Sequence, residues 1–108
     1  MCERPAQHPD VTTHWMQRVR ERIGPHVCPF ETWAAIRWAI DAGRTDLVEY
    51  VGRLNRDGRR VWKFRTPDGR YWFCIVDTEK WRPITVYEDG WLLRQKGKPP
   101  RVLRGTSC

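Results

Sequence analysis

Three basic side chains near the N-terminus recur at a helical spacing. His14, Arg18 and Arg22 stand four residues apart, so a helix places them on one ridge. The apolar residues of the same segment define the other side of that helix: Trp15, Val19 and Ile23. An arginine can bind a phosphate through two parallel hydrogen bonds, and a histidine can act as a base or an acid. The ridge therefore indicates either a phosphate-binding site or, equally, an exposed basic helix face that Glu21 partly balances.

Two further blocks concentrate positive charge. The chain has 108 residues, with 20 Lys or Arg against 13 Asp or Glu, and a net charge of +7. The first block consists of Arg53, Arg56, Arg59, Arg60, Lys63 and Arg65, and the second of Arg94, Lys96, Lys98, Arg101 and Arg104. Such blocks attract polyanions, with nucleic acid the first candidate and an acidic protein the second. A surface that is basic only for solubility is the alternative.

Two helices are predicted in the N-terminal part of the chain. The first begins at a capping threonine, Thr12 or Thr13, and Gly24 follows it as a left-handed terminator. The second covers residues 29–42, with proline at its start and Gly43 as its stop signal. Its expected core stripe is Phe30, Trp33, Ile36 and Ile40.

Short segments rich in Val, Tyr, Trp and Phe follow and predict four strands: Leu47–Leu54, Arg60–Thr66, Arg70–Asp77 and Pro83–Tyr87. Glycines at 58 and 69 mark two hairpin turns. The order predicts an α+β fold in which two N-terminal helices pack on one face of a four-stranded antiparallel sheet. Alternation places Trp62 and Phe64 against the helices and Lys63 and Arg65 on the open face.

Seven tryptophans are too many for a typical disordered chain. Four of them fall at spacings expected of a core: Trp15, Trp33, Trp62 and Trp72. Trp81 and Trp91 stand beside basic residues in expected loops. There an exposed ring could stack on a base or anchor an interface.

The length admits one domain, which we place at residues 11–93 between a flexible tail at 1–10 and a basic tail at 94–108. No apolar run is long enough to span a membrane or to form a signal peptide, which predicts a cytoplasmic protein. The cysteines Cys2, Cys28, Cys74 and Cys108 are widely separated, which favours reduced thiols. Neither metal-ligand pairs nor nucleotide-binding glycine loops occur, so no metal or cofactor is expected.

Three short patterns point to a known group of proteins. They are Thr-x-His-x3-Arg-x3-Arg-Ile-Gly from Thr12, Ala-Ile-Asp-Ala-Gly ending at Gly43, and Ile-Thr-Val-Tyr ending at Tyr87. In these patterns and in layout, residues 11–87 resemble the RelE- and BrnT-like small proteins of the barnase, EndoU, colicin and RelE superfamily. The resemblance implies two helices on a four-stranded sheet. It also implies a metal-independent endoribonuclease of toxin–antitoxin type or of a phage or plasmid locus.

The resemblance also implies a set of catalytic residues. A base removes the proton of a ribose 2′-hydroxyl, that oxygen attacks the phosphorus, and an acid protonates the leaving oxygen. His14 would be the base or acid, Arg18, Lys63 and Arg65 would stabilise the transition state, and Tyr87 would orient the phosphate or stack on a base. Further RNA contacts are expected from Arg22, Arg53, Arg59, Arg60, Trp81, Arg94, Lys96 and Lys98. The expected partners are RNA, including ribosome-bound mRNA, and an acidic antitoxin or another acidic protein.

Two alternatives to an enzyme remain open at this point. The first is a non-catalytic phage or mobile-element protein that binds nucleic acid or inhibits a host nucleoprotein defence complex, as anti-CRISPR proteins do. The second is a scaffolding module, which gives the basic blocks no role. The enzyme requires that His14 and the cations of the second strand face a common groove.

Overall fold

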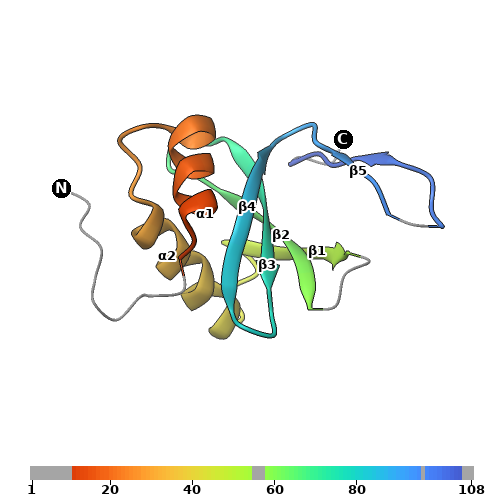
Figure 1. The fold of residues 1–108 in the computed structure, drawn as a ribbon, viewed down its shortest axis with the longest axis horizontal. Helices are drawn as coiled ribbons and strands as arrows, with labels where there is room; N and C mark the ends of the chain where they lie inside the picture. The colour runs from red at the N-terminus through yellow and green to blue at the C-terminus, as the bar shows by residue number, and fades with distance from the viewer. Residues whose placement is uncertain (1–10, 55–57, 96, 106–108) are drawn as a thin grey trace.

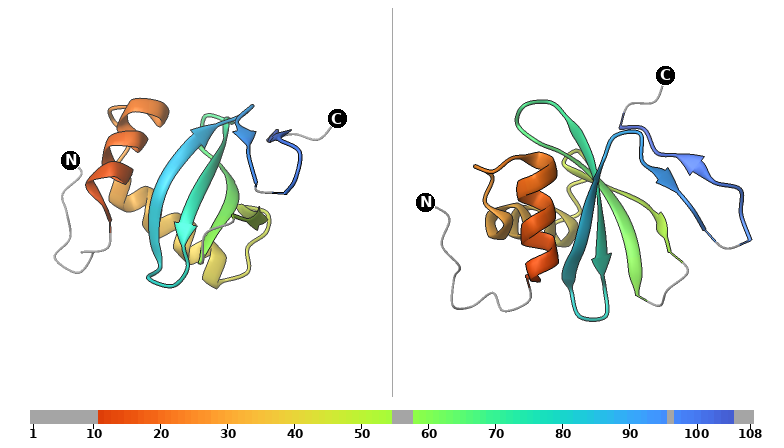
Figure 2. Two further views of the ribbon diagram at one scale, coloured as in Figure 1. Left: turned by 45° about the vertical axis from the view of Figure 1, so that its right-hand side comes forward. Right: turned by 45° about the horizontal axis from the view of Figure 1, so that its top comes forward.

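The computed structural model describes residues 11–54, 58–95 and 97–105, and these form three layers (Figure 1). Helices cover one face of a four-stranded antiparallel sheet, and a short C-terminal hairpin lies against the other face (Figures 1 and 2). The predicted α+β fold, with the helices N-terminal to the sheet, is confirmed. The elements are α1 (Thr13–Arg18), η1 (Val19–Ile23), α2 (Pro29–Asp41), β1 (Val48–Arg53), β2 (Arg59–Arg65), β3 (Tyr71–Asp77), β4 (Arg82–Glu88), β5 (Leu92–Leu93) and β6 (Arg101–Val102).

The first helix begins at Thr12, whose hydroxyl oxygen accepts a hydrogen bond from the Trp15 backbone N–H at 3.1 Å. α1 then widens into η1, a π-helical turn that closes when the Gly24 N–H donates to the Val19 carbonyl. Gly24 has φ 165° and ψ 149°, which is extended backbone, so the prediction of a left-handed Gly24 is wrong. The wide turn already satisfies that carbonyl, and no left-handed cap is needed. Gly43, after α2, does take a left-handed φ of 67°.

α2 begins with a proline, which has no backbone N–H. The first helical turn tolerates this residue because an N–H at that position would have no partner within the helix. The Trp15 indole N–H donates to the Pro29 carbonyl at 3.0 Å and so ties the first helix to the second. Phe30, Trp33 and Ile36 are buried as predicted, and the last residue of the expected stripe, at position 40, is partly buried.

The sheet is a meander with the strand order β1–β2–β3–β4. Each strand lies within one residue of its predicted bounds at either end. Gly58 and Gly69 take φ values of 75° and 91°, as their hairpin turns require. Trp62 and Phe64 pack against the helices, while Val61, on the alternate side of β2, belongs to the opposite cluster. The predicted assignment of the two sheet faces is therefore confirmed.

A hydrophobic cluster lies on each face of the sheet. The helix-side cluster includes the four predicted core tryptophans: Trp15, Trp33, Trp62 and Trp72. The hairpin-side cluster consists of Val61, Phe73, Ile75, Leu93 and Leu103. The second face is therefore closed over part of its area, which the expectation of an open face did not include.

The C-terminal hairpin corrects the predicted domain boundary. β5 pairs with β6, and the Leu103 N–H donates to the Trp91 carbonyl at 2.8 Å. Leu93 and Leu103 are both buried against the sheet. The described part of this segment, 94–95 and 97–105, is thus not simply a tail beyond the domain, since burial of Leu103 and the hydrogen bonds of Gly105 hold it on the sheet. The predicted tail at 1–10 and residues 106–108 lie outside the described residues.

Two features relate to the predictions of reduced thiols and of no membrane span: the state of the cysteines and the character of the helices. Cys74 is a free, buried thiol, whereas Cys28 is disulfide-bonded. The prediction of reduced thiols is right for the first and wrong for the second. Within the described ranges, no helix has the length and apolar character needed to cross a membrane.

Candidate nucleic-acid interface

The ridge of His14, Arg18 and Arg22 lies on the helix that runs beside β4, one of the two edge strands of the sheet (Figure 1). His14 is exposed, and the two arginines are half-buried. Arg18 Nη1 pairs with Glu21 Oε2 at 2.8 Å, so its charge is partly balanced within the helix. Hydrogen bonds from Gln17 and then Arg18 lower the pKa of the Glu21 carboxyl. This pairing is what we expect if the ridge is an exposed basic helix face that Glu21 partly balances.

Arg22 alone of the ridge reaches the sheet in the described contacts. Its Nη1 donates to the Val86 carbonyl of β4, and its guanidinium carbon lies 4.7 Å from the centre of the Tyr87 ring. Trp91 stacks on that same ring at 4.0 Å with an interplanar angle of 10°. Because the two neighbours cannot share one ring face, Tyr87 is held between them and has no free face for a base. The structure thus brings the predicted residues Arg22 and Tyr87 together, and Trp91 stands at the other end of the stack from Arg22.

Lys63 and Arg65 project from β2 toward the hairpin side, as predicted. Lys63 Nζ donates to the Gly105 carbonyl at 3.1 Å and pairs with Glu49 Oε2 at 3.1 Å. Both cations lie near the Tyr71 ring, at 5.5 Å for Lys63 and 5.8 Å for Arg65. Arg65 is exposed. The two predicted cations therefore differ, since Lys63 has partners inside the chain and Arg65 faces solvent.

His14 and Lys63 do not come together. Lys63 is on β2, two strands in from β4, which is about 10 Å at the usual strand spacing. His14 lies two helical turns before Arg22, or ~12 Å along a helix that runs beside β4 (Figure 2). These offsets are roughly perpendicular, so the backbones at the two positions stand about 15 Å apart, with His14 on the helix side and Lys63 projecting to the hairpin side. One phosphate cannot contact both.

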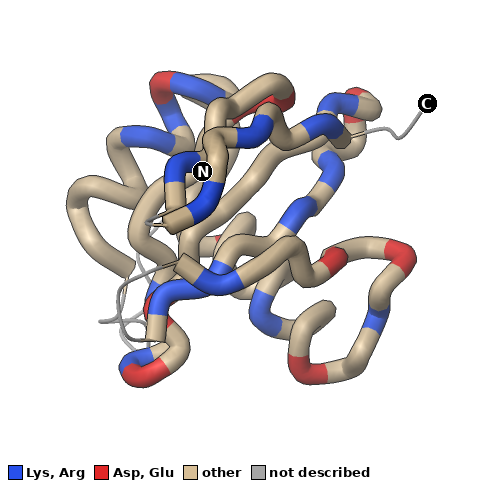
Figure 3. Tube along the Cα trace, turned by 90° about the vertical axis from the view of Figure 1, so that its right-hand side faces the viewer, with Lys and Arg blue, Asp and Glu red and all other residues tan. Residues whose placement is uncertain are grey.

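The hairpin adds a second set of cations to the side where Lys63 and Arg65 project. Its charged side chains are all basic and all exposed: Arg94, Lys98, Arg101 and Arg104. A hydrogen bond from the Gln95 side-chain amide to the Arg53 carbonyl fastens the hairpin to β1. Figure 3 views the molecule from this side, and Lys and Arg positions are distributed over it. The two basic blocks, far apart in the sequence, thus share one side of the molecule. Lys96 and Arg56 lie outside the described residues.

The remaining predicted contacts divide between the two sides. Arg59 alternates with Val61 and so belongs to the hairpin side, and Arg53 is exposed at the end of β1. Arg60 instead donates to the Tyr50 hydroxyl at 3.4 Å on the helix side. Trp81 lies there too, half-buried.

The surroundings of Trp81 account for its burial. Its ring is 6.5 Å from that of Trp62, and the Arg37 guanidinium lies over it at 5.7 Å. It also holds a φ of 51°, rare for a bulky residue. Arg60 and Trp81 are therefore not part of the hairpin-side surface.

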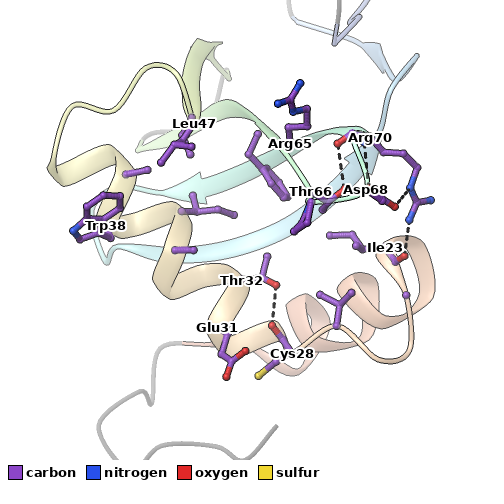
Figure 4. A pocket seen from close by; sticks show the side chains of 18 of the residues that line it. Ile23, Cys28, Glu31, Thr32, Trp38, Leu47, Arg65, Thr66, Asp68 and Arg70 are labelled. Atoms are coloured by element: carbon purple, nitrogen blue, oxygen red, sulfur yellow. Dashed lines mark hydrogen bonds and ion pairs between the residues drawn. The ribbon is translucent and has the colours of Figure 1, made fainter. Parts of the chain in front are cut away.

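A groove of about 810 Å³ opens on the helix side, between α2, the start of β1 and the β2–β3 turn (Figure 4). Trp38 and Leu47, both exposed, stand at its edge. Arg70, at the turn, is held by Asp68 at 2.7 Å and by the Ile23 carbonyl at 3.0 Å. The lining of the groove is largely apolar, which does not suit a chain of phosphates. Nothing in the sequence pattern predicts this groove.

Sequence reasoning missed two residues of the hairpin side, Tyr71 and Gly105. Strand alternation already places Tyr71 on the face of Lys63, so its position could have been used. Gly105 gives no signal, because its role depends on where the hairpin folds back. Across the described ranges, no group of three His, Cys, Asp or Glu side chains is arranged to hold a metal ion.

Comparison of the chain with protein-family models, with curated proteins and with solved structures finds no match.

Proposed function

We propose that this protein binds single-stranded RNA through its hairpin side. One observation carries the proposal: the second basic block folds back over the sheet face from which the first block projects Lys63 and Arg65. A surface of this kind can track a phosphate backbone, because each exposed cation releases a counterion from the nucleic acid when it contacts a phosphate.

The ion pairing of these cations favours a role in binding a polyanion over a purely structural role. The ion pairs found among the described residues include none that involves Arg65 or the four cations of the hairpin. Their charge is therefore available to a ligand. Trp91 is half-buried beside them, and a tryptophan ring can stack on any base. Cations with an adjacent indole suit an unpaired strand better than a duplex, whose bases are already stacked.

The geometry supports binding better than cleavage. Attack by a 2′-hydroxyl needs a base and an acid beside the phosphate. The two described histidines, His14 and His26, are both on the helix side of the sheet. An acidic protein that covered the hairpin side would compete with RNA for the same cations.

The test compares two variants that each lose four positive charges. In the first, Arg94, Lys98, Arg101 and Arg104 become glutamine. In the matched control, the exposed cations Arg20, Arg37, Arg44 and Lys80, away from the hairpin, become glutamine. Affinity for a fluorescent 20-nucleotide single-stranded RNA is measured by anisotropy over a series of KCl concentrations.

We expect the hairpin variant to lose at least tenfold in affinity and the control less than threefold. The dependence of log K on log salt should flatten by about 3 in the hairpin variant, because each phosphate of a single strand that no longer meets a cation removes roughly 0.7 from the slope. Equal losses in both variants would reduce the binding to net charge and overturn the proposal. Binding of poly-glutamate as tight as that of RNA would transfer the surface to an acidic protein and also overturn it.

A further inference from the structure

A small hollow lies where β1 begins and β2 ends. Its volume is about 180 Å³, and its polar lining includes Asp46, Glu49, Lys63, Arg65 and Tyr71. Pockets that hold drug-sized ligands have volumes of ~300 Å³ or more. The hollow therefore suits a smaller group, of the size of a single nucleobase.

The hollow lies on the sheet face that the proposed function assigns to RNA. Glu49 stands opposite Lys63 in the β1–β2 ladder, and Arg65 stands opposite Tyr71 in the β2–β3 ladder. Opposite positions in an antiparallel ladder share a sheet face. The β2 residues that alternate with Lys63 and Arg65 pack against the helices, so these four side chains project to the hairpin side. Figure 4 shows the Arg65 side chain directed away from α2.

Two groups of opposite charge on this lining can still bind a ligand. The Glu49 carboxylate pairs with Lys63 Nζ through Oε2 at 3.1 Å, and its side chain is 60% exposed. Its Oε1 atom has no partner among the described contacts. Arg65 is exposed, and its described contact is the Tyr71 ring, 5.8 Å from the guanidinium carbon. A carboxylate can accept two parallel hydrogen bonds, and a guanidinium can donate two.

A carboxylate would weaken a surface that contacts only phosphates, because like charges repel. It suits a surface that also contacts bases, whose N–H groups are donors. Guanine has two adjacent donors, N1–H and the N2 amino group, and two adjacent acceptors, O6 and N7. None of the other three RNA bases has both pairs. A carboxylate and a guanidinium around one hollow therefore match guanine.

We infer that the hollow binds one guanine base of the RNA. Glu49 accepts from N1–H and the N2 amino group, and Arg65 donates to O6 and N7. Lys63 is a positioning residue, because it holds the Glu49 carboxylate and balances its charge. The hairpin cations contact phosphates whatever the sequence, whereas the hollow makes affinity depend on a base. This inference rests on the proposed function and adds a sequence preference to it.

The experiment uses the full-length protein, the anisotropy assay described above and a set of labelled RNAs of equal length. One RNA contains uridine alone. In the others, every third uridine is replaced by guanosine, adenosine, inosine or 7-deazaguanosine, so that every binding register offers the base. Inosine lacks the N2 amino group of guanine and keeps its other edge groups, and 7-deazaguanine lacks N7.

The unaltered protein should bind the guanosine RNA about fivefold or more tightly than the all-uridine RNA. Adenosine should change affinity less than about twofold, because it lacks both pairs of groups. Inosine and 7-deazaguanosine should each lose most of the gain. An equal gain from guanosine and adenosine would mean that purines only stack, and would overturn the inference.

Two variants assign the two edges of the base. Glu49→Gln should abolish the guanosine gain yet leave or raise affinity for the all-uridine RNA, because it removes a negative charge. Arg65→Lys keeps the charge and loses the paired donors, so it should also abolish the gain, with less than about a twofold change for all-uridine RNA. Glu31→Gln, the matched control, removes an exposed carboxylate from α2 and should keep the full gain.

Binding of the all-uridine RNA shows that each variant is folded. A loss of affinity for every RNA in Glu49→Gln would make Glu49 a structural residue and overturn the guanine site. If the unaltered protein binds all the RNAs equally and through the hairpin, the guanine site alone fails. If it binds none of them, the proposed function fails as well.

Discussion

At the scale of single residues, a cation contributes to binding according to the partners it already has. The family resemblance implies that Arg18 stabilises a transition state, but Glu21 pairs with it one turn away. It places Lys63 on an open face, but Gly105 and Glu49 hold that lysine. Residue type and strand alternation predict where these side chains project. They cannot predict which partner the tertiary fold brings.

The buried thiol of Cys74 gives a prediction at this scale. Burial raises its pKa to about 12, and its side chain is inaccessible. The thiolate is the reactive form, so Cys74 in the folded protein should not react with iodoacetamide at pH 8. In guanidinium chloride it should react like an ordinary thiol, and mass spectrometry of the Cys74 peptide measures both. Modification of the folded protein at the unfolded rate would contradict the packing of β3 against the helices.

The β2–β3 turn gives a second prediction, on pH. A hydrogen bond from the Thr66 hydroxyl, then the Arg70 backbone N–H and side chain, lowers the pKa of Asp68 from 3.8 to about 2. The stabilisation from this carboxylate is therefore complete above its unfolded pKa and is lost as the pH falls toward 2. Thr66→Val should raise the pKa of Asp68, measured by NMR titration. Asp46, whose pKa is lowered chiefly by Arg44, is the internal reference and should not move.

At the scale of elements, the sequence predicts those whose signals are local. The strands β1 to β4 follow from alternation and from the turn glycines at 58 and 69. The hairpin does not, because β5 and β6 are two residues each, too short for any period. What holds them is burial of Leu93 and Leu103 on a distant sheet face. That is a tertiary contact, and a basic, proline-containing segment does not reveal it.

The hairpin makes a prediction for stability. Leu103→Ala should lower the free energy of unfolding by about 2–5 kcal/mol, because it removes a buried side chain and leaves a cavity. Val102, its neighbour, is 47% exposed, so Val102→Ala should change that free energy by no more than about 0.5 kcal/mol. Urea unfolding followed by tryptophan fluorescence measures both. Two variants of equal stability would mean that the segment is a tail after all.

At the scale of the whole molecule, the sequence supplies both basic blocks but does not show that they meet. Charge composition predicts a polyanion, and the face assignment of β2 places Lys63 and Arg65 correctly. The position of the helix ridge relative to the sheet is harder to predict. Helical spacing determines which residues share a helix face, but not which sheet edge that face meets. Arg22 meets Tyr87 at the β4 edge, whereas His14 is left two turns away. The candidate surface is therefore partly the predicted one, without its histidine.

The separation of His14 from Lys63 predicts that the protein binds RNA without cleaving it. With His14 on the helix side and its backbone about 15 Å from that of Lys63, we expect no phosphate on the hairpin side to contact both. A 5′-labelled single-stranded RNA incubated with excess protein in EDTA should therefore stay intact on a denaturing gel. His14→Ala should bind it with unchanged affinity, since His14 is exposed on the helix side. Cleavage that is lost in His14→Ala would instead support the endoribonuclease hypothesis. It would require α1 to move across the β4 edge when RNA binds.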